Sequence, residues 1–237
     1  MSSPTRIDKE PAAPNETEER IKRFLATASH DLQSPLRHIT MYAEILLDDL
    51  GESLDAEQLQ SLRMILEKAQ TAQRLTKALM TFAAGTPQVA VGESSLNTVL
   101  ENVWMELKQE MDIPNATIAV ADLPSVRTDA ALLGTALKNV ISNALLSRSA
   151  APHVSIHAER DGPNWAIHIA DNGPGIDPAH QGKIFDPFWK LPNAGTVPGP
   201  GLGLMTARDL LKALGGNILL DHSDKNGSRF TITLPAG

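Results

Sequence analysis

The stretch ASHDLQSPLRHI, residues 28 to 39, places a proline inside what otherwise reads as one amphipathic helix. Apolar residues recur at steps of three and four on both sides of it: Ile21, Phe24, Leu25, Ala28 and Leu32 before, and Ile39, Tyr42, Ile45, Leu46 and Leu50 after. Pro35 has no N–H, and its ring crowds the carbonyl of Asp31, which costs a helix about 3 kcal/mol. Taken alone, the stretch is better explained by Ser34 capping a second helix that begins at Pro35. The choice between one kinked helix and two helices therefore depends on the rest of the chain.

The composition limits the class of protein. The chain has 237 residues, of which 42% are hydrophobic, enough for one large domain or two small ones. A net charge of −7 and the lack of any cluster of Lys and Arg argue against a nucleic-acid partner. The absence of cysteine excludes disulfides and thiolate metal sites. Because the sequence shows neither a signal peptide nor an apolar run approaching about 18 residues, we expect a cytoplasmic protein without direct membrane insertion.

The first third of the chain divides into a tail and two long helices. Residues 1 to 18 are rich in Pro, Ser and Glu and predict a disordered tail. Residues 19 to 84 follow helical spacing, and the apolar positions of the second helix are Leu59, Leu62, Ile65, Ala69, Ala72, Leu75, Leu79 and Phe82. Gly51 is a stop signal and Ser53 or Asp55 a new cap, so the short connection predicts an antiparallel hairpin. Because both apolar stripes are broad, we expect a homodimer in which two hairpins form a four-helix bundle.

A second unit is expected over residues 87 to 237, after the hairpin unit of residues 19 to 86 and the linker AAGTPQ. The sequence predicts helices at 95–110 and 129–147 and a third from about 203, with strands at 116–120, 153–159, 165–170, 217–220 and 229–234. Helices and antiparallel strands in this order predict an α+β sandwich in which helices cover one face of the sheet.

Three motifs in the second unit carry side chains suited to chemistry. LKNVISNAL (137–145) places Asn139 and Asn143 four apart on one helical face. ADNGPGI places Asp171 directly after an apolar strand, and GPGLGLMTARDLL leads from three glycines into a helix. Taken singly, each motif is also explained by a solvated helix surface, an ordinary turn or a common helix start.

Together the three motifs suit a nucleotide. Glycines allow the backbone to approach a ligand closely, and N–H groups at a helix start favour phosphate. An Asp at the end of a strand can accept a hydrogen bond from an exocyclic amine. The amide oxygen of Asn143 is a hard ligand for Mg²⁺, which prefers few protein ligands together with phosphates and water.

The ordered set of motifs resembles the sensor histidine kinases of two-component systems, over residues 20 to 237. SHDLQSPLRHI resembles their H box, and HDLQSPL is especially similar to that of phytochrome-type kinases. LKNVISNAL resembles the N box, DNGPGI the first glycine box, IFDPFWK the F box and GPGLGL the second glycine box. The resemblance implies a helical hairpin followed by an ATP-binding domain of the GHKL type. It also favours one kinked helix at Pro35, since a proline five residues after the phosphorylated histidine bends the first helix in this family.

The resemblance also implies roles for individual residues. His30 attacks the γ-phosphate of ATP, Asp31 positions the ring or takes its proton, and Ser34 stands where bifunctional relatives position water for dephosphorylation. Asn143 binds Mg²⁺ with help from Asn139. The expected nucleotide contacts are Asp171 for adenine, Gly173 and Gly175 along the base, Phe185 and Phe188 anchoring a lid over 190–198, Lys190 as the basic residue, and Gly199, Gly201 and Gly203 at the phosphates.

The implied partners are a second copy of the chain, the receiver domain of a response regulator and an upstream sensor. Because the sequence shows no sensor domain before residue 19, the input is expected from a partner protein or from a longer chain of which this is a fragment.

Two other functions fit parts of the sequence. Gyrase-type ATPases resemble the N box but have a Glu where Asn139 stands, and they have no H box. A non-catalytic histidine phosphotransfer or scaffold protein with a degenerate ATP-binding domain is suggested by Leu146 and Ser147, where relatives commonly have a basic residue and then an aromatic one. The retained Asn143 and Asp171 and the glycines favour the kinase.

His157 and His168 are expected to face each other across the predicted strand hairpin. A two-histidine metal site is one explanation, and a solvated outer face of the sheet is the other. The lack of a carboxylate at suitable spacing favours the solvated face.

Overall fold

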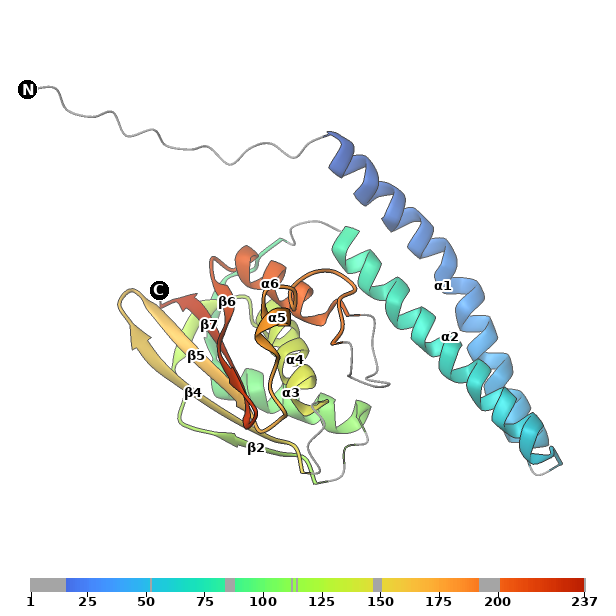
Figure 1. Cartoon of the computed structure of the whole chain (residues 1–237). Helices are drawn as coiled ribbons and strands as arrows, with labels where there is room; N and C mark the ends of the chain where they lie inside the picture. Colours follow the sequence, from blue (N-terminus) through green and yellow to red (C-terminus); the bar gives the residue numbers. More distant parts are fainter. Residues whose placement is uncertain are drawn as a thin grey trace, which may run out of the picture.

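The structure is a computed structural model that describes residues 16–51, 53–83, 88–111, 113, 115–146, 151–191 and 201–236. A helical hairpin is followed by a sheet with helices on one face (Figure 1). Most of the expected tail, residues 84–87 of the linker, Ser147 and Gly199 lie outside the described residues, as does most of the expected lid. The first helix begins at Glu16, so the prediction of a tail is wrong for residues 16 to 18.

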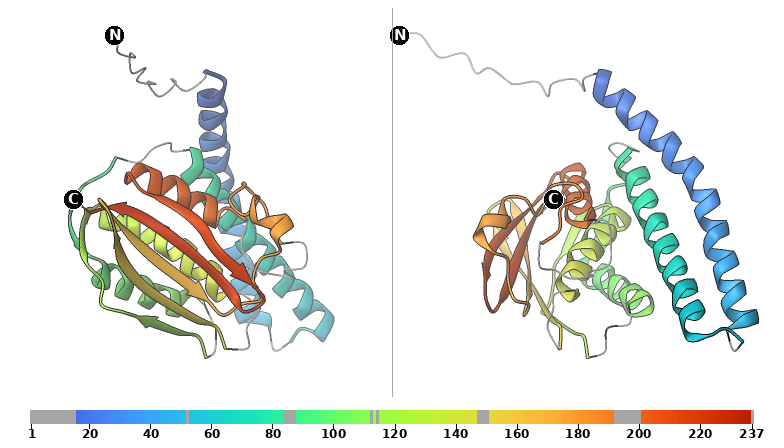
Figure 2. Two further views of the ribbon diagram at one scale, coloured as in Figure 1. Left: turned by 60° about the vertical axis from the view of Figure 1, so that its left-hand side comes forward. Right: turned by 45° about the vertical axis from the view of Figure 1, so that its right-hand side comes forward.

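The hairpin consists of α1 (Glu16–Leu50) and α2 (Ala56–Ala83), which pack along each other. Pro35 lies inside α1, so the interpretation with two separate helices is wrong. Figure 2 shows α1 as one bowed helix, consistent with a backbone that lacks one internal hydrogen bond.

Residue identity explains the turn between α1 and α2. The N–H of Gly51 donates to the carbonyl of Leu47 at 3.0 Å, and a side chain on Gly51 would overlap that carbonyl. Asp55 and Gln58 bond reciprocally, with each side chain accepting from the other's N–H at 2.8 and 3.2 Å. This exchange is a capping box, so Asp55 is confirmed as the cap of α2.

The main sheet has the order β2-β4-β5-β7-β6. Its strands are β2 (Thr117–Val120), β4 (His153–Asp161), β5 (Asn164–Asp171), β6 (Asn217–Asp224) and β7 (Gly227–Pro235). The expected antiparallel pairing is found for β4, β5, β7 and β6, whereas β2 pairs with β4 in parallel. The chain reaches β4 from β2 through a long connection that contains α4, as a parallel pair requires.

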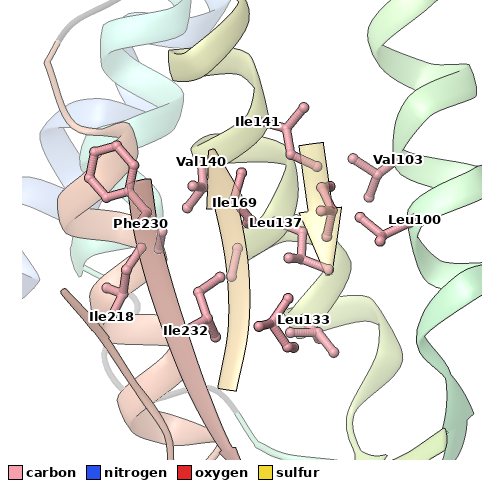
Figure 3. Packing of buried hydrophobic residues seen from close by; sticks show 14 of the residues in the cluster. Leu100, Val103, Leu133, Leu137, Val140, Ile141, Ile169, Ile218, Phe230 and Ile232 are labelled. Atoms are coloured by element: carbon pink, nitrogen blue, oxygen red, sulfur yellow. The ribbon is translucent and has the colours of Figure 1, made fainter. Parts of the chain in front are cut away.

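Three helices cover one face of this sheet: α3 (Leu96–Glu110), α4 (Ala130–Leu145) and α6 (Gly203–Ala213) (Figure 2). The buried face of α4 lies between α3 and the strands, as Figure 3 shows. Its side chains Leu133, Leu137, Val140 and Ile141 are at most 1% exposed. Burying each such side chain contributes roughly 1.5–3 kcal/mol, so α4 is the centre of the core.

Three short elements were not predicted: β1 (Gly92–Ser95), β3 (Ser125–Thr128) and α5 (Pro178–Gln181). β1 and β3 pair with each other in a separate antiparallel ribbon. Four-residue segments such as GESS and SVRT are too short to show a strand period.

His157 and His168 do face each other, with ring centroids 4.8 Å apart. The expectation of a solvated face is wrong for His168, which is buried and bonds to Thr231 Oγ1 at 2.9 Å and Glu159 Oε1 at 3.3 Å. In the described part of the chain, no group of three or more His, Cys, Asp or Glu side chains could hold a metal ion. None of the described helices is both long and apolar enough to span a bilayer.

Asp129 caps the N-terminus of α4 and also fastens the segment before β1. Its Oδ1 accepts from the N–H groups of Ala131 and Leu132 at 3.0 and 3.1 Å, and its Oδ2 accepts from Ala90 at 2.8 Å. The bond from Ala90, followed by that from Leu132, lowers the pKa of Asp129. The carboxylate form is therefore the one that stabilises the folded state.

We predict that Asp129→Ala lowers the free energy of unfolding by about 1–2 kcal/mol, the usual value of an N-cap. Because the folded pKa is lowered, this stabilisation is present above the unfolded pKa of about 3.9 and is lost as the pH falls through the folded value. Denaturant unfolding at several pH values measures it. Asp129→Asn is the control, since it keeps a capping oxygen and should be the milder change. Equal stability of Asp129→Ala and the unmodified chain at pH 7 would contradict the assignment.

Candidate active site

His30 stands on the solvent side of α1 with its side chain 77% exposed. Its Nδ1 lies 3.2 Å from Oδ1 of Asp31, which is equally accessible. When Nδ1 carries the proton and donates it to this carboxylate, Nε2 keeps a lone pair that points away from Asp31. Ser34 is exposed one turn further along the helix. The geometry therefore presents an oriented imidazole nitrogen to an incoming electrophile.

The side chain of Asn139 on α4 lies against the first residue of α6. Its Nδ2 donates to the carbonyl of Thr135 at 3.0 Å, which turns Oδ1 toward the neighbouring helix. A methyl group on Gly203, the first residue of α6, would lie only 3.4 Å from that Oδ1. Asn143, one turn further along α4, is exposed. The predicted N box and second glycine box are thus adjacent, with the Asn143 amide accessible beside them.

Asp171 ends β5 and is half-buried. Its Oδ1 accepts from the N–H of Gly173 at 2.7 Å and from that of Ser228 at 3.3 Å. Burial raises the pKa of Asp171, and the two backbone bonds offset the rise only in part. Such a carboxylate is poorly hydrated and fixed in direction, so it can accept a hydrogen bond from an amine that enters the site.

The turn between β6 and β7 holds the first glycine segment in place. Gly175 has φ +73°, and a side chain there would overlap the carbonyl of Asp224. The N–H of Ile176 donates to Ser223 Oγ at 2.7 Å, and Ser223 Oγ lies 2.9 Å from Ser228 Oγ. Since Ser228 also donates to Asp171, one serine pair fixes both ends of the segment from 171 to 176.

Asn172 secures the same segment on its other side. Its Oδ1 accepts from the N–H of His153 at 2.9 Å, and its Nδ2 donates to the carbonyl of Ala151 at 3.0 Å. These bonds continue the pairing of β4 and β5 beyond the last strand residues. Asp171 is therefore held between two fixed neighbours.

The F-box segment, residues 184–190, packs against both α6 and β7. The ring of Phe185 lies edge-on to Phe230 at a centroid distance of 6.4 Å. Gly201 has φ +74°, and a side chain there would meet the backbone of Phe188 and Trp189 at 2.7–3.2 Å. The side chain of Phe188 itself is 52% exposed, so its backbone makes this contact.

Sequence reasoning missed Ser223, Ser228, Asn172 and Arg208, which support the segments that it did find. Their residue types are common in turns and on helix surfaces, and only the tertiary pairing of distant segments shows their partners. Lys190 is exposed at the end of the F-box segment.

The residues present fit a nucleotide with Mg²⁺. Asp171 offers a fixed acceptor, and Gly201 and Gly203 add no side chain of their own between the F-box segment and Asn139. Asn143 offers a neutral hard oxygen, which suits Mg²⁺ where phosphates supply the remaining charge and ligands. β5 packs against α4, which brings the element that carries Asp171 next to the one that carries the asparagines.

Two family models match the chain. The "His Kinase A (phospho-acceptor) domain" matches residues 20–87, and the "Histidine kinase-, DNA gyrase B-, and HSP90-like ATPase" matches residues 128–237. The first covers the hairpin with His30, and the second covers α4, α6 and the strands β4, β5, β6 and β7 of the main sheet.

Known proteins match over nearly the whole chain. Phytochrome-like protein Cph1 of Synechocystis is 28% identical over 92% of this chain and 29% of its own length. Sensor protein KdpD of Escherichia coli is 30% identical over 93% of this chain and 25% of its own length. The chain thus spans less than a third of these relatives.

Among solved structures, that of full-length ShkA in complex with AMPPNP has the same fold, with a TM-score of 0.70 at 24% identity. The matched region covers 90% of this chain and 46% of the ShkA chain. The first family model falls on the hairpin that carries His30, and the second falls on the domain that carries Asn143, Asp171 and the glycines. The chain belongs to the sensor histidine kinases of two-component systems.

Proposed function

We propose that this chain is an ATP-dependent protein-histidine kinase that phosphorylates His30 and passes the phosphoryl group to an aspartate of a response regulator. One observation carries the proposal: a single chain holds an exposed imidazole oriented by Asp31 and a site whose Asp171 and glycines suit a nucleotide. A gyrase-type ATPase would lack the exposed histidine, and a non-catalytic phosphotransfer or scaffold protein would lack the nucleotide site.

His30 acts as the nucleophile of the first step. Nε2 forms a bond to the γ-phosphorus while the bond from that phosphorus to the β–γ bridging oxygen breaks, which releases ADP. Asp31 holds the Nδ1 proton through the 3.2 Å contact, so the developing positive charge on the ring is compensated. In the second step a carboxylate oxygen of the regulator attacks the phosphorus and the N–P bond breaks, which returns His30 to its starting form.

Asn143, Asp171 and the glycines would position the nucleotide. Phosphoryl transfer depends mainly on alignment and on neutralising phosphate charge, and Mg²⁺ supplies part of that neutralisation when it is bound. Asn143 would ligate this ion with help from Asn139, and Asp171 would accept from the adenine amine. The AMPPNP in the ShkA complex supports ATP as the nucleotide of this chain.

A homodimer is the proposed assembly, formed through residues 19 to 86. In the hairpin, large apolar side chains that are at least 41% exposed are Ile21, Phe24, Leu32, Ile39, Met41, Tyr42, Ile45, Leu46, Leu50, Met64 and Ile65. Near the turn, a hollow of about 530 Å³ is lined in part by Leu46, Leu54 and Leu62. Two further helices from a second copy would cover these side chains and fill this hollow.

The reaction requires ATP and a response regulator, so we place the kinase in the cytoplasm. The signal would come from an upstream sensor protein or domain. The hydroxyl of Ser34, exposed one turn from His30, is the group that would position water if the kinase also dephosphorylates its regulator.

We predict that His30→Gln reduces acid-labile protein phosphate to background while nucleotide binding is unchanged, because the variant loses the nucleophile but no residue of the nucleotide site. Incubation with γ-labelled ATP and Mg²⁺ measures the phosphate. His38→Gln is the matched control, since His38 is also exposed on α1, and it should label like the unmodified chain. Acid-labile label that persists in His30→Gln would refute the assignment.

We predict that Asn143→Ala lowers both Mg²⁺-dependent nucleotide affinity and the autophosphorylation rate, the latter on the order of 100-fold or more, because phosphate charge is then poorly compensated. Titration with a fluorescent ATP analogue at several Mg²⁺ concentrations measures the affinity. Asn102→Ala on α3 removes a comparable exposed amide and should change neither value. If Asn143→Ala autophosphorylates like the unmodified chain, the N box is assigned wrongly.

We predict that light scattering gives twice the chain mass at micromolar concentration and that Leu46→Glu gives the single-chain mass. A charge among the interface side chains would have to be buried without a partner. Met105→Glu is the control, because Met105 is similarly exposed but lies on α3, outside the hairpin. A monomeric mass for the unmodified chain would contradict the dimer.

A further inference from the structure

Arg208 connects α6 with the F-box segment. It lies on α6 five residues after Gly203 and is half-buried. Its Nη2 donates to the carbonyl of Phe185 at 3.2 Å, and its guanidinium carbon lies 5.4 Å from the centre of the Phe185 ring. A single side chain therefore holds both the backbone and the ring of Phe185.

This position is an unfavourable one for an arginine. Its Nε is buried and has no hydrogen-bond partner, and no described carboxylate forms an ion pair with it. A partly buried cation that lacks an acceptor for one N–H is costly, and an apolar side chain of similar length would avoid that cost. General stability of the core therefore does not explain the arginine.

The two elements that Arg208 joins both border the glycines of the candidate site. Phe185 is wedged between Arg208 and Phe230 of β7, so its place relative to the sheet is fixed. On the other side, Gly201 touches the backbone of Phe188 and Trp189, and Gly203 begins α6 beside Asn139. If the F-box segment moved away from α6, the contact at Gly201 would open.

We propose that Arg208 is a positioning residue that fastens the F-box segment to α6 and so holds Gly201 and Gly203 in the geometry that a nucleotide phosphate requires. Arg208 acts through Phe185 and the glycine backbone rather than on the phosphoryl group itself. This inference rests on the proposed nucleotide site and adds to it a supporting residue to which the sequence analysis assigned no role. Loss of the arginine should therefore weaken binding more than the chemical step.

The test compares Arg208→Met with Arg208→Lys in the full chain. Met keeps a chain of similar length but has no donor or charge, and it should raise the Kd for a fluorescent ATP analogue about tenfold, equivalent to about 1.4 kcal/mol. The KM for ATP should rise in parallel while kcat stays within about twofold, since binding is affected and chemistry is not. Lys keeps a charge near the ring and an ammonium group that can donate to the Phe185 carbonyl, so its Kd should lie between those of Arg208→Met and the unmodified chain.

Lys212→Met on the last turn of α6 is the matched control, because it removes the same charge from the same helix on an exposed position. Its Kd and KM should equal those of the unmodified chain. Hydrogen exchange provides a second measurement: amides 185–191 should exchange faster in Arg208→Met, whereas those of β4 and β5 should not. If Arg208→Met does not fold, Arg208→Lys provides the test. A raised Kd and faster exchange of amides 185–191 in that variant would support the proposal, and unchanged values would overturn it.

An unchanged Kd in a folded Arg208→Met would overturn the proposal, and so would a loss confined to kcat. Faster exchange throughout the sheet would assign Arg208 to general stability instead. The kinase proposal fails separately, since a chain that binds the analogue but never labels His30 still reports the Kd of each variant. A chain that binds no nucleotide at all overturns both.

Discussion

The packing of α4 is the constraint on which both the core and the candidate site depend. One face of this helix carries side chains at most 1% exposed, and they lie between α3 and the sheet (Figure 3). The other face carries Asn139 and Asn143, and Asn139 meets the first residue of α6. Because the buried face cannot rotate without opening the core, the direction of the two asparagines is fixed by apolar packing. Asp129 fixes where the helix begins, so the asparagines are also fixed along the helix axis.

Close backbone contacts then bring distant segments to this helix. Gly203 lies against Asn139, Gly201 against the F-box backbone, and Gly175 against the turn between β6 and β7. At Gly175 and Gly201 the contact leaves no room for a side chain and φ is positive, so these two glycines are explained by the fold as well as by a ligand. The close contacts at Gly175 and Gly201 place these two backbone segments before any ligand binds, which reduces the ordering cost of binding.

Local sequence patterns predicted the elements whose residues are periodic. The two hairpin helices, α3, α4, α6 and the strands β4, β5, β6 and β7 lie where apolar spacing and caps placed them, within a few residues. The parallel pairing of β2 and the ribbon of β1 and β3 escaped prediction, because pairing partners depend on the path of the chain and not on local spacing. At the site, the motifs identified Asp171 but not Ser228, which donates to it from 57 positions along the chain. Support of this kind is a tertiary property and leaves no local pattern in ordinary serine, asparagine or arginine residues.

The two ionisable groups proposed to accept the phosphoryl group and to recognise adenine, His30 and Asp171, lie in opposite environments, and each environment suits its task. Asp171 is half-buried, and burial raises its pKa, so the carboxylate is held where it has few competing water molecules. A recognition group gains from this, because its hydrogen bond to a ligand replaces little hydration. His30 is 77% exposed on a long helix and has one carboxylate neighbour. A group that must meet both a nucleotide and a separate receiver domain has to be reachable by each in turn, and a buried imidazole could serve at most one of them. Exposure at His30 and burial at Asp171 are therefore two requirements of the same reaction, and placing them on a helical hairpin and on a packed sheet allows one chain to meet both.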